Sequence, residues 1–275
     1  KCPTIITFNF DKNISIKLLK RGFQLLFYNL SFYLILLSAR TIVSKFYKVE
    51  EFALFTFSIS FVASSIMLIE SINFLFFPKM LNKFSRLETT SAIKDLLSKI
   101  REIYLPIVIL TLFSMILILP LIFRLLPKYY GAFDTIGNLG LYQLFTANNF
   151  GFTTLLLQRK KENVVTYIGF FSVGLFVLFS LVGIKYLKVD FSKIGLILAL
   201  VMMINNFLIF YFGSKMVLLK TDLFIIIKDS FNVKLILPFL LCVIFLSFNK
   251  NYFIVVMFFI GFIILNYKNL IKNFK

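Results

Sequence analysis

Long apolar runs alternate along this chain with short clusters of lysine and arginine. A helix needs roughly 20 residues to cross the hydrocarbon core of a bilayer, and a nearly uncharged run of that length is typical of a membrane span. The runs occupy residues 22–47, 52–77, 103–123, 132–157, 164–187 and 194–219, and two shorter ones follow at 235–248 and 252–267. We therefore expect about eight transmembrane helices.

The amino-acid composition supports this interpretation. The chain is 60% hydrophobic and only 15% charged, whereas about a quarter of the residues in a soluble domain are charged. Inside a bilayer only helices and closed barrels satisfy the hydrogen bonds of the backbone. The strands of a barrel would alternate apolar and polar residues, which these continuous runs do not. The sequence therefore predicts an all-α polytopic membrane protein.

The 30 lysine and arginine residues are distributed unevenly between the runs. Most of them precede the first run or fall in every second loop after it. By the positive-inside rule these segments, together with both ends of the chain, face the cytoplasm. Orientation and the attraction of anionic lipid headgroups account for the net charge of +18. We therefore expect membrane lipids as partners, and no nucleic acid.

The runs suggest a division of the chain into three parts. Residues 1–21 form a cytoplasmic N-terminal segment that begins with neither methionine nor a signal pattern, so we expect an N-terminally truncated chain. Residues 22–219 form a six-helix lobe, and residues 220–275 form a linker and a two-helix hairpin. Within the lobe, the amphipathic stretch near 85–101 is predicted to lie on the cytoplasmic surface as an interfacial helix.

Polar side chains inside membrane spans are the candidates for function, because they are costly to bury in lipid. In the first run Asn29, Tyr33 and Arg40 lie within about 40° of one another at 100° per residue. We expect this stripe to face the bundle interior and to bind an anionic substrate, although Arg40 could equally reach the membrane surface. Glu70 in the second run is a candidate site for a coupling ion or proton, or a carboxylate close enough to the cytoplasm to meet water.

The fourth run is the most polar. Four of its residues lie within about 100° of arc, namely Asp134, Asn138, Asn148 and Asn149. We expect this face to line a cavity and to bind sugar hydroxyls, while Gln143 points the opposite way. Amides also join membrane helices to one another, and that role is favoured for Asn205 and Asn206 in the sixth run.

Signals for catalysis are missing from the sequence. There is no zinc-protease, esterase or phosphate-loop motif. The chain has no histidine, and its 2 cysteines lie far apart. We therefore expect no catalytic residue, no metal site and no cofactor, and a protein that is not an enzyme.

Four local patterns carry a resemblance to a known family. They are Lys-Arg-Gly-Phe at 20–23, Glu-Glu-Phe-Ala-Leu-Phe-Thr-Phe-Ser at 50–58, Phe-Pro-Lys-Met at 77–80 and Leu-Pro-Lys-Tyr-Tyr-Gly-Ala at 126–132. Over residues 18–219 the chain resembles the C-terminal half of a polysaccharide (O-antigen type) flippase of the multidrug/oligosaccharidyl-lipid/polysaccharide exporter superfamily. The last hairpin is similar to the extra helix pair of its fourteen-span members.

The resemblance implies two six-helix lobes around a cavity that opens alternately to each side of a bacterial inner membrane. The substrate would be an undecaprenyl-diphosphate-linked oligosaccharide, moved from the cytoplasmic to the periplasmic leaflet for O-antigen and lipopolysaccharide biosynthesis. The partner would be the missing N-terminal lobe of the same protein, and contacts with other polysaccharide-assembly proteins are compatible with it. Relatives often carry an acidic residue before the basic one that matches Arg40. Here the run is Ser38-Ala39-Arg40, which argues against ion coupling through this helix.

Three alternatives remain. A multidrug exporter of the same superfamily would favour acidic cavity residues over Arg40, since its substrates are cationic. A membrane-embedded glycan polymerase or ligase would be expected to carry a large periplasmic loop with arginine and histidine, which is not seen here. In a non-transporting membrane scaffold the polar stripes would have no substrate to bind.

Overall fold

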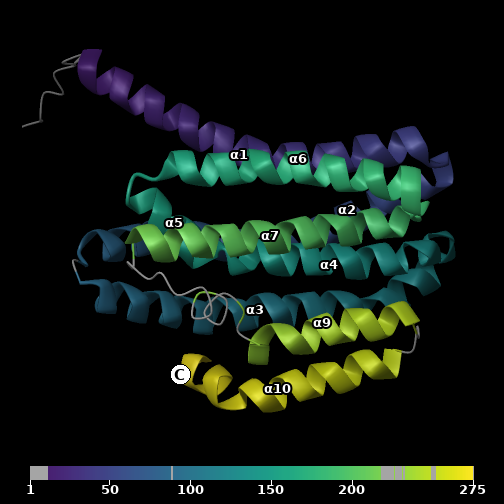
Figure 1. Ribbon diagram of the computed structural model, residues 1–275. Coiled ribbons are helices and arrows are strands. Elements are labelled where there is room, and N and C mark those ends of the chain that lie inside the picture. The colour runs from purple at the N-terminus through teal and green to yellow at the C-terminus, as the bar shows by residue number, and fades with distance from the viewer. Residues whose placement is uncertain are drawn as a thin grey trace, which may run out of the picture.

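The computed structural model describes residues 12–87, 89–217, 226, 231, 233–248 and 252–274, and all regular elements among them are helices (Figure 1). They are α1 (Lys12–Phe46), α2 (Val49–Ser85), α3 (Thr90–Leu125), the 3-10 helix η1 (Pro127–Ala132), α4 (Phe133–Asn148), α5 (Phe150–Gln158), α6 (Glu162–Leu187), α7 (Phe191–Val217), α9 (Val233–Phe248) and α10 (Tyr252–Phe274). By length and apolar composition, 5 segments could cross a membrane: α1, Val49–Ser71 of α2, α3, α6 and Phe191–Lys215 of α7. The predicted all-α polytopic membrane protein is confirmed.

Successive apolar runs cross the bundle in opposite directions, with α4 and α5 together forming the fourth run, and the bundle extends from α1 and α6 through α7 and α4 to α3, α9 and α10 (Figure 1). One end of the bundle holds the start of α1, the end of α2 and the start of α3. It also holds most of the lysine and arginine residues, and we call it the basic end. The predicted segment 1–11 and most of the predicted linker, 218–225 and 227–230, lie outside the described residues.

The C-terminal pair α9 and α10 forms the predicted hairpin, and this hairpin packs against α3 and α4 (Figure 1). Phe113 of α3 lies at the centre of the contact. Its ring centroid is 5.2 Å from that of Phe239, 5.6 Å from that of Phe259 and 5.9 Å from that of Phe262. Aromatic contacts of this kind join the hairpin to the lobe, so these helices share one apolar core.

The amphipathic stretch near 85–101 is not a separate interfacial helix. From Thr90 onward it forms the first turns of α3, which continues without a break to Leu125. Pro106 lies inside the helix and does not end it. The polar first turns therefore extend a membrane helix at the basic end of the bundle, because no strong helix breaker separates them from the apolar run.

At the opposite end, a hydrogen bond joins two turns of the chain. The Tyr47 hydroxyl, between α1 and α2, donates to Val189 O between α6 and α7 at 2.6 Å. Burial raises the pKa of Tyr47 to about 12, and the nearby Asp190 and Glu51 carboxylates add to the increase. The hydroxyl therefore keeps its proton and can donate throughout the neutral pH range.

The contact between α1 and α6 depends on a glycine. A Cβ atom added at Gly169 would overlap Ser31 Oγ and lie 2.9 Å from Ser31 Cβ, so rotation of the hydroxyl could not relieve the clash. Gly174, further along the same helix, has nothing within 4 Å of an added Cβ. The two glycines thus form a matched pair for a test of helix packing.

We expect G169A to lower the free energy of unfolding by about 1–3 kcal/mol, because it forces α1 and α6 apart. G174A should leave it unchanged or raise it slightly, since alanine favours the helix over glycine by about 1 kcal/mol. Thermal unfolding followed by circular dichroism in detergent measures both variants. In an S31G background the cost of G169A should largely disappear, and equal effects of G169A and G174A would contradict this packing.

Candidate functional site

The fourth apolar run is interrupted at Asn149. Here the backbone N–H of Asn149 donates to Thr146 O at 3.2 Å, three residues back, instead of continuing the α-helical pattern to Phe145 O. The next helix, α5, then begins at Phe150. Such an interruption leaves a carbonyl without its helical partner, which is costly away from water. The side chain of Asn206 on α7 solves this problem, because its Nδ2 donates to Phe145 O at 3.3 Å.

Four asparagines form a buried hydrogen-bonded cluster around this interruption. Asn148 Nδ2 donates to Asn206 Oδ1 at 3.0 Å, Asn206 Nδ2 donates to Asn149 Oδ1 at 2.9 Å, and Asn149 Nδ2 donates to Asn205 Oδ1 at 3.0 Å. Each of the four side chains is at most 5% exposed. We call this set the asparagine cluster. Asn206 is about 22 Å from the start of α7 and about 16 Å from its end at 1.5 Å per residue, so the cluster lies near the middle of the bundle.

Two further helices join the asparagine cluster. On α6, Ser172 Oγ accepts a hydrogen bond from Asn205 Nδ2 at 2.9 Å. On α3, Arg101 Nη2 donates to Asn148 Oδ1 at 2.9 Å, and its guanidinium lies 4.6 Å from the centroid of the Phe210 ring. A hydrogen bond from a charged donor is stronger than one between neutral groups. The interruption between α4 and α5 is thus tied to α3, α6 and α7.

A cavity of about 440 Å³ lies beside the interruption, between α1, α2, α3, α4 and α5. Its polar lining consists of amides, hydroxyls and one carboxylate: Tyr28, Asn29, Glu70, Tyr104, Gln143, Thr146, Asn149, Thr153 and Thr154. Of the described residues that line it, Glu70 alone is charged. We call it the central cavity. Its mixture of apolar walls and a few polar groups is typical of a small-molecule site.

The central cavity continues toward the basic end of the bundle. A wider recess of about 640 Å³ shares Leu25, Phe77 and Leu157 with it, and its remaining lining includes residues near the end of α2 and the start of α6. We call this recess the vestibule. The shared residues come from α1, α2 and α5, so the passage between the two spaces lies between these three helices.

The predicted stripe on the first helix is only partly directed inward. Asn29 is exposed and lines the open central cavity, whereas Tyr33, 74% exposed, and the half-buried Arg40 lie outside it. The reason is that α1 buries a different face, which carries Ser31 and Ile35. At 100° per residue that face lies on roughly the other side of the helix. Asn29 and Glu70 therefore meet at one cavity, whereas Asn29, Tyr33 and Arg40 do not.

On the fourth run, the expected orientation of the polar face is wrong. The side that carries Asn138 and Asn148 faces α7, where Asn138 Nδ2 donates to Ser192 O at 3.0 Å and Asn148 joins the asparagine cluster. Gln143, expected to point away from the cavity, lines it instead. Asn149 belongs to both places, since it lines the cavity and bonds to α7. Asn138 and Asn148 therefore bond to neighbouring segments and do not line the cavity.

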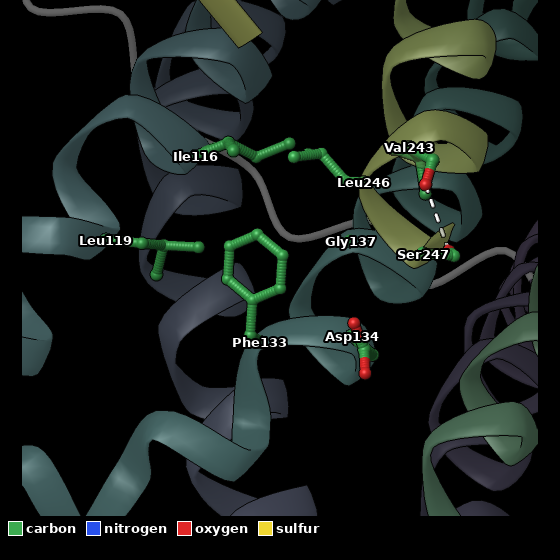
Figure 2. A pocket seen from close by; sticks show the side chains of 8 residues that line it. All are labelled: Ile116, Leu119, Phe133, Asp134, Gly137, Val243, Leu246 and Ser247. Carbon is green, nitrogen blue, oxygen red and sulfur yellow. Dashed lines mark hydrogen bonds between the residues drawn. The ribbon is translucent and has the colours of Figure 1, made fainter. Parts of the chain in front are cut away.

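Asp134 lies in the first turn of α4, at the opposite end of this helix from Asn148. Figure 2 shows it beside a small recess of about 10 Å³, together with Phe133, Gly137 and Ser247. The Ser247 hydroxyl donates to Val243 O of its own helix at 3.0 Å. A space of this size holds roughly one water molecule. Asp134 therefore has no place in the central cavity.

Sequence reasoning missed several lining residues and the arginine of the cluster. Thr146 and Thr153 are common residues in membrane helices and carry no signal of their own, and Arg101 lies just before the third apolar run, where a basic residue is expected at the membrane surface. No group of three or more histidine, cysteine, aspartate or glutamate side chains within the described part of the chain could hold a metal ion.

Comparison of the chain with protein-family models, curated proteins and solved structures finds no match. The class of this protein is therefore assigned from its fold and its site alone. This is an all-α polytopic membrane protein with a polar cavity beside an interrupted helix.

Asn206 is the member of the cluster whose loss should matter most. N206A leaves Phe145 O, Asn148 and Asn149 each short of one partner, and we expect a loss of about 1–2 kcal/mol in the free energy of unfolding. N163A, which removes an exposed asparagine near the start of α6, should change it by less than about 0.5 kcal/mol. Thermal unfolding in detergent compares the two variants, and equal stabilities would rule out a structural role for the cluster.

Proposed function

We propose that this protein is a membrane transporter, a flippase that moves a lipid-linked oligosaccharide across the bilayer by alternating access. The observation that carries the proposal is the central cavity, an open space of about 440 Å³ among apolar helices, with a lining that includes amides, hydroxyls and one carboxylate. It adjoins the one-residue interruption at Asn149, where the backbone stays in the right-handed helical region but the N–H of Asn149 bonds to the carbonyl three residues back.

The lining chemistry suits a glycan. Gln143 and Asn149 offer amides, and Thr153 and Thr154 offer hydroxyls, which can exchange hydrogen bonds with sugar hydroxyls in place of water. A diphosphate with sugars cannot cross about 30 Å of hydrocarbon unaided, because its polar groups would lose their partners. A cavity of this kind shelters the glycan while the lipid tail stays in the bilayer.

The proposal places the basic end at the cytoplasmic face of a bacterial inner membrane, following the positive-inside rule. The vestibule then opens toward the cytoplasm, where an undecaprenyl-diphosphate-linked oligosaccharide is made. The exposed side of α1, which carries Leu30, Tyr33 and Leu37, is available to a second helical lobe. Glu70 is the proposed site of the coupling ion, because it is the acidic group in contact with the cavity.

A multidrug exporter is the second candidate, and one observation favours it. The described lining of the central cavity contains the carboxylate of Glu70 and no cationic side chain. Arg40, expected to meet an anionic substrate, lies outside. A cationic amphiphile would find its counter-charge in such a cavity.

The full-length protein, reconstituted in liposomes with a fluorescent undecaprenyl-diphosphate-linked oligosaccharide, provides the test. Access of an impermeant lectin to the glycan reports its translocation. We expect E70Q to slow translocation by at least about tenfold, which corresponds to about 1.4 kcal/mol of barrier. E50Q makes the same change in the exposed first turn of the same helix, away from the cavity, and should leave the rate unchanged.

The same liposomes distinguish the two candidates. Efflux of a cationic dye that depends on Glu70, with no glycan translocation by the unaltered protein, would support the exporter. If the unaltered protein moved neither substrate, transport itself would be excluded as the function.

A further inference from the structure

A second recess of about 300 Å³ lies between α2 and α3 at the basic end. Three lysines line it, Lys79 and Lys83 from α2 and Lys99 from α3. The rest of its lining is almost wholly apolar: Met80, Leu96, Ile100, Ile103, Tyr104, Ile107 and Phe150. We call it the lysine groove. It combines a cationic rim with an apolar floor, and it is separate from the central cavity and the vestibule that the glycan is proposed to use.

Asp95 and Glu102 lie one turn before and after Lys99 on α3, but the three lysines are not paired with a carboxylate in the described part of the chain. Each lysine side chain is exposed, and none forms an ion pair or hydrogen bond with another residue in the described part of the chain. The Glu102 carboxylate, on the next turn of α3, accepts a hydrogen bond from Ser98 Oγ at 3.0 Å. Three like charges around one recess repel one another, so an anion between them would be stabilising.

The position of the groove along the bundle indicates what kind of anion this is. Lys83 lies near the end of α2, and Lys99 precedes the apolar run that begins near residue 103, so the lysines lie where a membrane surface would be. Ile103 and Ile107 follow Lys99 at successive turns of the same face of α3. From the lysines, the groove therefore continues toward the hydrocarbon along an isoleucine stripe.

We propose that the lysine groove binds an anionic phospholipid of the bilayer, with the phosphate between the three lysines and one acyl chain along Ile103 and Ile107. Charge complementarity holds the headgroup, and apolar contact holds the chain. A free phosphate would use only the first of these interactions. The groove shares Tyr104 and Phe150 with the central cavity, so a lipid bound there contacts two residues of the cavity wall.

Binding of phosphatidylglycerol to the purified full-length protein, measured by native mass spectrometry, tests the proposal. We expect K79Q/K83Q/K99Q to raise the apparent Kd by at least about tenfold. K94Q/K160Q/K161Q removes three exposed lysines from the same end outside the groove, and its Kd should stay within about twofold of the unaltered protein. K79R/K83R/K99R should bind normally, because it keeps the charges.

Circular dichroism verifies that the groove variant is folded, and if it is not, K83Q alone should still weaken binding by about threefold. Phosphatidylcholine, inorganic phosphate and glycerol phosphate are the comparison ligands, and each should bind more weakly than phosphatidylglycerol. Equal loss in the two triple glutamine variants would overturn the proposal, as would equal binding of inorganic phosphate. It would also be overturned if the folded groove variant bound phosphatidylglycerol as tightly as the unaltered protein. Because no glycan transport is measured, the result is independent of the flippase proposal.

Discussion

Every backbone N–H and C=O group in the hydrocarbon core of a membrane needs a partner inside the protein, since water is absent there. Continuous helices meet this requirement without help. The interruption at Asn149 does not, and Asn206 of α7 supplies the missing donor to Phe145 O. The asparagine cluster is thus assembled around a defect in one helix.

This solution joins packing to the central cavity. The asparagine cluster connects α3, α6 and α7 to the interruption, through Arg101, Ser172 and Asn206. Asn149 takes part in the cluster and also lines the cavity. Any rearrangement of the junction between α4 and α5 therefore changes the cavity wall and the contacts with α7 together. The proposed flippase would use a coupling of this kind to alternate between two states.

The apolar runs predicted the helices closely, because a bilayer selects for length and hydrophobicity, and both are local properties. The interruption of the fourth run was not predicted, since Asn149 has no helix-breaking side chain comparable to proline. Of the predicted site residues, Asn29, Glu70 and Asn149 meet at the central cavity. Arg40 and Asp134 lie elsewhere. A polar residue within a span indicates either a buried partner or a cavity, and its polarity does not distinguish the two.

The sequence by itself determined that the chain is a helical membrane protein, which end of the bundle is basic, and which residues share a helix face. Only the tertiary structure decided where each face points. Helical periodicity gives the angle between Asn148 and Gln143, and it leaves the rotation of the whole helix undefined. That rotation depends on which neighbour offers the better contact. The asparagine face of α4 packs against the amides of α7, so Gln143 on the opposite face lines the cavity.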